Sequence, residues 1–187
     1  AEVNATVDAV CAARKNLKRL GRGEVLALSP TTGLIGHDGW GDGRAGAGSR
    51  STVLLNDFTL IGDLAGLNET DLFLKLESLG RAAGEYFQKT LEKALRDYRH
   101  VYIVTHVPPF VEACWHRGAI SSPEWQSHFT CVAAGEAIRE VSAKFPGRRV
   151  TVLCGHTHSA GDTVIDGRIT VKTGGTEYGD PHVNGVF

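Results

Sequence analysis

Two short segments of the sequence carry histidines in settings that favour metal binding. His106 lies in Thr-His-Val-Pro-Pro, and His156 and His158 lie in Gly-His-Thr-His. Neutral imidazole is the commonest metal ligand in proteins, and two histidines two residues apart in a turn can point at one ion or at two neighbouring ions. The glycine before His156 permits a sharp turn, and the two prolines stiffen the chain after His106. These residue types and spacings predict a metal site formed by the three histidines.

Each histidine segment follows an apolar run that is typical of a buried strand. Residues 101–104 precede His106, and residues 150–154 precede His156. Strands that are apolar on both faces are expected to be covered by other layers on each side. Ligands of open α/β sheets collect outside the carboxyl ends of the strands, where loops converge on a rigid support. We therefore expect the three histidines to meet at one edge of a sheet.

Periodicity and turn residues predict the remaining elements. Asn68-Glu69-Thr70-Asp71 offers capping chemistry at the start of the longest apolar stripe. A long loop with no predicted element covers residues 107–126, and its polar and aromatic residues, His116 and Trp125 among them, either line a pocket or cap the sheet. The expected elements are a helix over residues 1–18, a hairpin of strands 25–28 and 34–35, a helix from about 72 to 98, a helix over 132–145, and a terminal hairpin of strands 163–165 and 169–171.

Residues 36–48 are unusually rich in glycine. The segment holds six glycines together with His37, Asp38, Trp40 and Asp42. Such a density suits backbone that is held close to a ligand, and it equally suits a flexible loop. The sequence leaves both interpretations open.

The two histidine segments, Thr-His-Val-Pro-Pro and then Cys-Gly-His-Thr-His about fifty residues later, resemble the two C-terminal motifs of the calcineurin-like metallophosphoesterases. The resemblance implies an α/β fold of the αββα sandwich type and hydrolysis of a phosphomonoester or phosphodiester. It also implies a dinuclear centre of divalent manganese, iron, nickel or zinc, in which His106 and His156 bind one ion and His158 binds the other. Two such ions would activate a bridging water and hold the phosphoryl oxygens.

Further residues are assigned near the substrate or behind the metal ligands. Residues 34–42 are similar to a family loop that places a tryptophan and polar groups beside the metals. Thr157 and Asp42 are added because they are near the ligands in sequence and could orient them, and His116 because its loop could shape a substrate pocket. The family's N-terminal motifs, Asp-x-His, Gly-Asp-x-x-Asp and Gly-Asn-His-Asp, have no counterpart here. We therefore expect a sandwich that is incomplete on its N-terminal side and completed by a preceding segment or by a homo-oligomer. The assigned set is His37, Asp38, Trp40, Asp42, His116 and Thr157.

Two other classes of function remain open. One is a structural zinc module, in which Cys154, His156 and His158 would join one of three further residues in a closed tetrahedral site. The sequence lacks the paired Cys-x-x-Cys spacing that such modules use. The other is a binding domain without catalytic activity, because the carboxylate ligands of the family are missing. The candidates for the fourth zinc ligand are Cys114, His116 and Cys131.

Composition narrows the class of protein. With 187 residues and 42% hydrophobic content, the chain can bury one core, so we expect a single domain over residues 1–187. The 20 Lys and Arg and 21 Asp and Glu residues give a net charge of −1, which provides no overall basic field for nucleic acid or anionic membranes. No apolar run is long enough to span a bilayer, and the four cysteines are scattered. We expect a cytoplasmic protein with reduced thiols.

Overall fold

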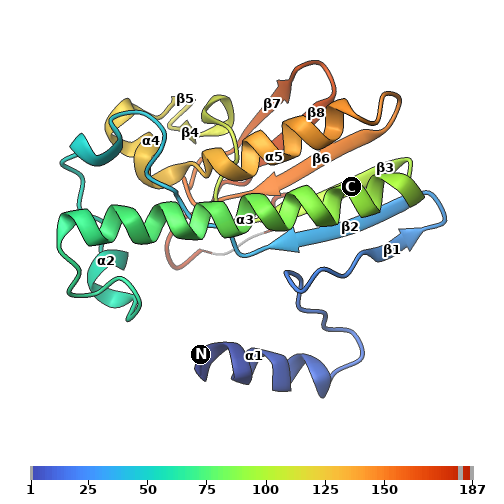
Figure 1. Ribbon diagram of the computed structural model, residues 1–187, viewed down its shortest axis with the longest axis horizontal. Coiled ribbons are helices and arrows are strands. Elements are labelled where there is room, and N and C mark those ends of the chain that lie inside the picture. The colour runs from blue at the N-terminus through green and yellow to red at the C-terminus, as the bar shows by residue number, and fades with distance from the viewer. Residues whose placement is uncertain (1, 181–182, 186–187) are drawn as a thin grey trace.

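A mixed six-stranded sheet forms the centre of the structure, a computed structural model that describes residues 2–180 and 183–185 (Figure 1). The strand order is β1-β2-β3-β6-β8-β7. β2, β3, β6 and β8 run parallel to one another, whereas β1 pairs antiparallel with β2 at one edge and β7 pairs antiparallel with β8 at the other. The carboxyl ends of β2, β3 and β6 therefore lie side by side. The strands are β1 (Leu26–Ser29), β2 (Thr32–His37), β3 (His100–Thr105), β6 (Arg149–Cys154), β7 (Gly161–Ile165) and β8 (Ile169–Thr173).

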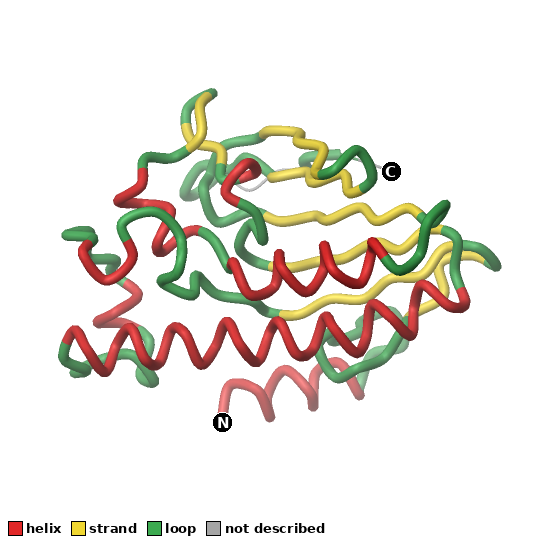
Figure 2. Tube along the Cα trace, turned by 45° about the horizontal axis from the view of Figure 1, so that its top comes forward, coloured by secondary structure: helices red, strands yellow, loops and turns green. Residues whose placement is uncertain are grey.

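Two long helices, α3 (Glu69–Asp97) and α5 (Val132–Ala143), lie side by side over one face of this sheet (Figures 1 and 2). Each connects two parallel strands, α3 between β2 and β3 and α5 between β3 and β6. Both connections move across the sheet in the same direction, and right-handed crossovers in one direction place their helices on the same face. The expectation of cover on each side is wrong for β3, whose Val104 is 38% exposed, because α3 and α5 lie over the same face of the described sheet.

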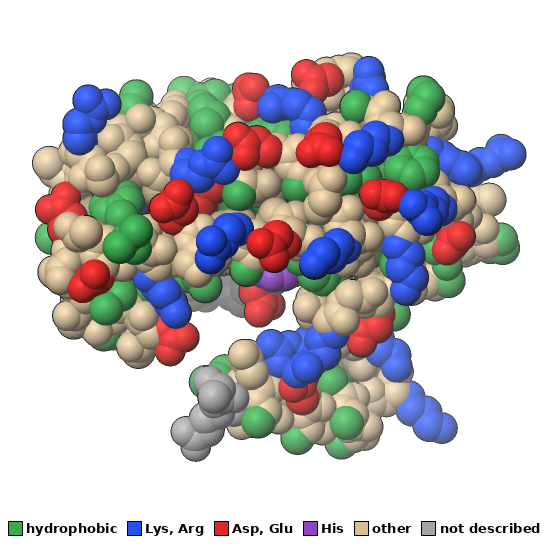
Figure 3. All heavy atoms as spheres, viewed as in Figure 1, with side chains coloured by type: hydrophobic (Ala, Val, Ile, Leu, Met, Phe, Trp, Pro, Cys, Tyr) green, Lys and Arg blue, Asp and Glu red, His purple; other side chains and the backbone are tan. Residues whose placement is uncertain are grey.

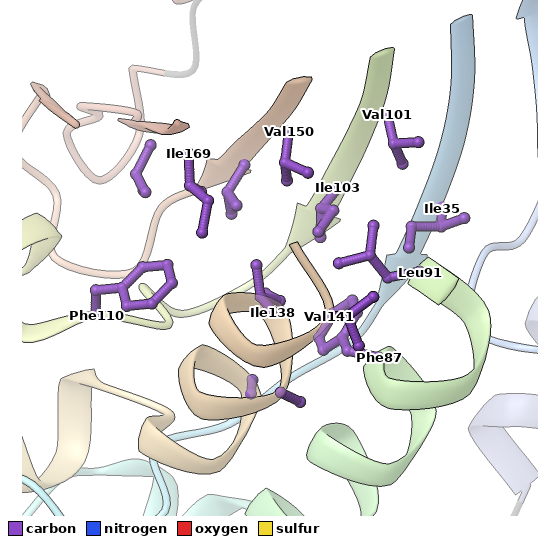
Figure 4. Packing of buried hydrophobic residues seen from close by; sticks show 14 of the residues in the cluster. Ile35, Phe87, Leu91, Val101, Ile103, Phe110, Ile138, Val141, Val150 and Ile169 are labelled. Carbon is purple, nitrogen blue, oxygen red and sulfur yellow. The ribbon is translucent and has the colours of Figure 1, made fainter. Parts of the chain in front are cut away.

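The core fills the space between the sheet and these two helices (Figure 4). Alternate strand residues point at the helices, so Ile35, Val101 and Ile103 are fully buried. On the opposite face Tyr102 is half-buried and Val104 is 38% exposed. The sheet thus has one buried face, under α3 and α5, and one face that is partly exposed to solvent.

The start of α3 follows the predicted capping chemistry. The side chain of Asn68 accepts a hydrogen bond from the N–H of Asp71 at 3.0 Å, which satisfies one of the free donors of the first turn. The helix is held against α5 by a close approach at Gly84, where a Cβ atom would lie 2.9 Å from the carbonyl oxygen of Ala133. Glycine at this position lets the two helices pack backbone to backbone.

The N-terminal helix is shorter and less covered than expected. α1 spans Glu2–Ala12, so the predicted helix over residues 1–18 is wrong beyond Ala12, and Ala1 lies outside the described residues. Val3, at 76%, and Val10 are exposed, and α1 lies beyond the β1–β2 end of the sheet (Figure 1). The apolar residues of α1 have helical spacing, but Val3 and Val10 are exposed and do not pack into the core. Packing of an apolar face is the main stabilisation of a helix in a protein, so a longer helix is not supported here.

The predicted loop over residues 107–126 contains short elements. These are a 3-10 turn η2 (Val111–Ala113), a hairpin of β4 (Trp115–His116) and β5 (Ala119–Ile120), and the start of α4 (Pro123–Phe129). Two others, the 3-10 turn η1 (Gly48–Arg50) and α2 (Asp57–Leu60), lie before α3. The two predicted hairpins at either end of the sheet are confirmed; β1 is shifted by one residue at the same length, and β2, β7 and β8 are longer than expected.

The surface over α3 and α5 carries charges of both signs. Lys and Arg side chains are interspersed with Asp and Glu side chains across this face (Figure 3). Among the helices in the described ranges, none combines the length and the hydrophobicity that crossing a membrane requires.

Candidate metal and phosphoester site

His106 and His156 meet at the carboxyl edge of the sheet. His106 follows β3 directly, and His156 follows β6 after Gly155. The Nε2 atom of His106 and the Nδ1 atom of His156 are 3.0 Å apart, and the ring centroids are 4.7 Å apart. The two loops are tied together because the N–H of Gly155 donates to the carbonyl oxygen of His106 at 2.9 Å. Neighbouring parallel strands thus place the two imidazoles in contact.

His158 lies apart from this pair. Its ring packs edge-on against Tyr178, with the centroids 4.5 Å apart. His156 and His158 both adopt left-handed backbone conformations, with φ of 71° and 59°, which are uncommon for residues other than glycine and which turn successive side chains in different directions. Thr157 between them is buried, and its N–H donates to the carbonyl oxygen of Gly155 at 2.9 Å. Within residues 2–180 and 183–185, no three His, Cys, Asp or Glu side chains are grouped to hold a metal ion.

Aromatic rings enclose the histidine pair. Trp40 stacks on His106 with centroids 5.7 Å apart and an interplanar angle of 19°, and it also touches His156 at 5.4 Å. Phe129 meets His156 edge-on at 4.8 Å. Burial lowers the pKa of His156 to about 3, helped by the neighbouring imidazoles, and burial also lowers the pKa of His106 against the opposing effect of Asp57. Both imidazoles are therefore neutral near pH 7, the form in which a ring nitrogen offers a lone pair.

The spacing of the two nitrogens suits a shared ion. Two imidazole nitrogens that are each about 2.1 Å from one ion and 3.0 Å from each other subtend an angle of about 90°, as neighbouring ligands do in octahedral coordination. The Nε2 atom of His156 is buried and has no hydrogen-bond partner among the described residues. The two nitrogens are joined by a hydrogen bond in this structure, and their distance alone matches two ligand positions of one metal ion, which would replace that bond. The remaining ligand positions would need groups beyond this pair.

The end of β2 holds His37 and Asp38, and the ring of His37 packs against Tyr86 of α3 with centroids 5.0 Å apart, not against the histidine pair. The Nδ1 atom of His37 accepts a hydrogen bond from the N–H of Gly39 at 3.1 Å, and burial lowers the pKa of this imidazole. The carbonyl oxygen of Asp38 accepts the N–H of His106 at 3.0 Å. Its carboxylate is exposed and lies 3.9 Å from the guanidinium of Arg19. Asp38 therefore positions His106 through its backbone, and its side chain remains accessible to solvent.

Asp42 is placed differently from the other residues of its segment. It is 1% exposed, and its carboxylate accepts the N–H of Ala133 at 2.8 Å and that of Arg44 at 3.2 Å. Ala133 lies in the first turn of α5, where N–H groups lack helical partners and a negative charge is favourable. Burial raises the pKa of Asp42, and these backbone donors oppose the rise. The carboxylate fastens the glycine-rich segment to α5.

The glycines of residues 36–48 allow close packing against α4. A Cβ atom on Gly41 would lie 2.0 Å from the carbonyl oxygen of His128, and one on Gly46 would lie 2.1 Å from that of Pro123. The N–H of Gly43 donates to the carbonyl oxygen of Ser127 at 3.0 Å. The segment is therefore held against protein backbone over α4, and this packing keeps Trp40 against the histidine pair.

His116 lies on the hairpin of β4 and β5, and its side chain is exposed. The hairpin is anchored by Trp115, whose ring occupies the space that a side chain on Gly161 would need and whose Nε1 donates to Thr163. At its tip the N–H of Arg117 donates to the hydroxyl of Ser159 at 2.9 Å. These contacts bring His116 to the loop that follows His158, not to the histidine pair.

Of the cysteines considered for a structural zinc site, Cys114 and Cys131 are buried and Cys154 is half-buried. Burial raises the pKa of Cys131 and of Cys154 to about 12, which favours the neutral thiol over the thiolate that binds zinc. The Sγ atom of Cys154 contacts Thr173 at 3.5 Å, and that of Cys114 faces the carbonyl oxygen of Phe129 at 4.0 Å. Cys154 thus packs within the sheet, as its place in an apolar strand predicts.

Two aromatic residues of the site were not found from the sequence. Phe129 touches His156, and Tyr178 touches His158. Phe129 could have been placed beside Trp125, because Ser122-Pro123 is a typical helix start and residues four apart lie on the same side of a helix. Tyr178 lies in irregular backbone near the C-terminus, where no periodicity marks it.

Comparison of the chain with family profiles, with characterised proteins and with solved structures found no match. A groove of about 770 Å³ between α3 and α5 is lined by charged side chains such as Arg81 and Glu136 and contains none of the three histidines. The candidate site therefore consists of the histidine pair and its aromatic neighbours.

Proposed function

We propose that this protein is a metal-dependent phosphoesterase in which His106 and His156 bind one divalent ion. The observation that carries the proposal is the convergence of their Nε2 and Nδ1 atoms, 3.0 Å apart, at the carboxyl ends of two adjacent parallel strands. The neutral state of both imidazoles and their rigid loops support it, because a ligand must offer a lone pair in a fixed direction. The resemblance of both segments to calcineurin-like metallophosphoesterases supports the same assignment.

The proposed roles of the chain's own residues follow from their positions. His106 and His156 hold the ion, Trp40 and Phe129 exclude water from one side of it, and Asp38 orients His106. His158 packs on Tyr178 away from the contact between His106 and His156, but its charge acts on both imidazoles, and it is proposed as a ligand of a second ion. When bound, divalent manganese, iron, nickel or zinc would supply a water of lowered pKa and positive charge for the phosphoryl oxygens.

The sheet face opposite α3 and α5 is partly exposed to solvent. Tyr102, Val104 and Leu153 leave apolar surface incompletely covered on the side away from α3 and α5. Uncovered apolar surface of this kind favours a further layer. We propose that a preceding segment of the polypeptide or a second copy covers this face, which would complete an αββα sandwich and bring the carboxylate ligands that the histidine pair lacks.

A second candidate function is a binding domain without hydrolytic activity. It is favoured by one observation, that no group of three metal-ligating side chains forms within the part of the chain that the structure describes. In that case the histidine pair and its aromatic neighbours would line a recognition cleft.

The deciding experiment combines metal analysis with hydrolysis. The natural full-length polypeptide is loaded in turn with manganese, iron, nickel and zinc, and cleavage of 4-nitrophenyl phosphate and bis(4-nitrophenyl) phosphate is followed. We expect activity that falls by about 100-fold or more in His106→Ala, since an ion that loses a ligand loses its fixed geometry. His100→Ala is the matched control, because His100 begins the same strand and lies at its opposite end, bonded to Thr151 at 2.9 Å. Metal binding without hydrolysis favours the binding domain, and neither metal binding nor hydrolysis refutes the phosphoesterase proposal.

A further inference from the structure

Helix α1 is held to the rest of the protein by charged side chains and not by apolar packing. Among its residues from Val3 to Ala12 none is buried, and its valines are exposed. The helix lies apart from the sheet and from α3 and α5 (Figure 1). An isolated helix of 11 residues is only marginally stable in water. The polar contacts of α1 therefore determine whether it stays attached and folded.

Two arginines that follow α1 in the chain make these contacts. The Nη1 atom of Arg19 donates to one carboxylate oxygen of Asp8 and to the carbonyl oxygen of Asn4, each at 3.0 Å. Its Nη2 atom donates to the side-chain oxygen of Asn4 at 2.8 Å. The other carboxylate oxygen of Asp8 accepts a hydrogen bond from Arg22. Each oxygen of one carboxylate is thus bound by a different guanidinium.

The segment that carries both arginines is seated on the sheet. A Cβ atom on Gly36 of β2 would lie 2.6 Å from the Cδ1 atom of Leu20, so Leu20 packs on the strand where glycine leaves room for it. The side chain of Arg19 is 17% exposed, and its guanidinium also lies 3.9 Å from the carboxylate of Asp38. The arginines are therefore fixed to the sheet, whereas the carboxylate that they bind belongs to α1.

A cavity of about 230 Å³, which we call the α1 pocket, opens between α1 and this segment. At about 30 Å³ for each water molecule in the liquid, this volume exceeds what the five non-hydrogen atoms of a phosphate need. Asp38 opposes an anion there, but its side chain is 84% exposed, where water and salt screen its charge. The α1 pocket is bounded by Asn4, residues 19–22, His37 and Asp38.

We propose that the α1 pocket binds a phosphate group, for which the carboxylate of Asp8 is an internal substitute. Guanidinium groups bind carboxylates and phosphates through the same paired geometry, so a phosphate that suits Arg19 and Arg22 competes with Asp8. A phosphate brings three oxygens and nearly two negative charges, whereas the carboxylate brings two oxygens and one charge. The pocket contains neither His106 nor His156, so this site depends on neither a metal nor hydrolysis.

Binding of phosphate and release of α1 are coupled in this arrangement. Displacement of Asp8 breaks the hydrogen bonds that hold the helix, and it exposes little further apolar surface because the valines of α1 already face solvent. The tethered carboxylate acts at an effective concentration in the millimolar range, so phosphate at about that concentration or above competes with it. The detached helix then unfolds, because it is too short to be stable alone.

The first test measures binding by isothermal titration calorimetry at constant ionic strength. Inorganic phosphate and O-phosphoserine distinguish the free ion from a phosphomonoester, and acetate and chloride are the control anions. We expect Arg19→Ala to weaken phosphate binding by about tenfold or more and Asp8→Asn, which removes the competing charge, to tighten it by about fivefold. Arg14→Ala is the matched control, because it removes the same charge from an exposed residue outside the pocket, and it should change nothing. Equal binding in the wild-type protein and in His106→Ala keeps the histidine pair apart from the result.

Hydrogen exchange followed by mass spectrometry tests the release of α1. Phosphate should speed the exchange of the amides of residues 2–12 and leave those of α3 unchanged, which shows that the rest of the protein stays folded. Arg19→Lys keeps the charge but lacks the planar fork, so it should bind phosphate weakly in a folded protein. The proposal is overturned by full phosphate affinity in Arg19→Ala, by loss of binding in His106→Ala, by equal action of acetate and phosphate, or by unchanged exchange in residues 2–12. Because no ester is hydrolysed in either test, the phosphoesterase proposal is decided separately.

Discussion

Replacement of Gly41 by alanine tests the packing that holds Trp40 against the histidine pair. The added Cβ atom would lie 2.0 Å from the carbonyl oxygen and 2.5 Å from the carbonyl carbon of His128, which are backbone atoms that no rotamer change can move. Relief would require the segment to separate from α4, where the N–H of Asp42 donates to the carbonyl oxygen of Thr130 at 3.1 Å. Overpacking of this kind costs about 1–3 kcal/mol, and a strained or lost hydrogen bond adds about 1 kcal/mol.

We therefore expect Gly41→Ala to lower the free energy of unfolding by about 3 kcal/mol, which corresponds to a fall in Tm of about 6–12 °C for a domain of this size. Thermal unfolding followed by circular dichroism measures it. Gly62→Ala is the matched control, because nothing lies within 4 Å of its Cβ position, and it should change the stability by about 0.5 kcal/mol or less. Equal stability of the two variants would refute the close packing of residues 36–48 on α4.

Two further predictions concern the supporting elements. Asn68→Ala should lower the free energy of unfolding in urea by about 1 kcal/mol, because it removes the side-chain cap of α3. Asn56→Ala is the control and should lower it much less, because the Asn56 side chain makes no cap bond at the start of α2. Equal losses in the two variants would contradict the capping role of Asn68. Burial lowers the pKa of His128 below 6.5, so its unfolded imidazole takes up a proton that the folded one resists, and stability present above pH 6.5 is lost as the pH falls. His128→Gln should make this acid decline shallower, by at most about 1.4 kcal/mol per pH unit, and an unchanged slope would argue against a buried neutral imidazole.

The strands and long helices were predictable because their signals are local. Runs such as residues 101–104 and the stripe after Asn68 carry their own periodicity, and the structure places β3 and α3 there. α4 escaped prediction because seven residues hold too few apolar positions to establish a period, although Ser122-Pro123 marked its start. The open sheet face was not predictable from β3 itself, since an apolar run does not reveal on which side the crossover helices lie.

Part of the candidate site was likewise predictable from the sequence, and part was not. Placement of His106 and His156 at adjacent strand ends follows from two apolar runs and a parallel sheet. The separation of His158 from the pair depends on the left-handed backbone of His156 and His158, which their residue types do not indicate. The role of Asp42 at the start of α5 also escaped prediction, because it depends on a contact between segments 91 residues apart.

The central claim is that His106 and His156 share a metal ion. A crystal structure of the protein soaked with zinc, with anomalous diffraction recorded at the zinc edge, measures this directly. We predict an anomalous peak about 2.1 Å from both the Nε2 atom of His106 and the Nδ1 atom of His156. A peak beside Cys154 instead, or an intact hydrogen bond between the two imidazoles with no zinc at the pair, would contradict it.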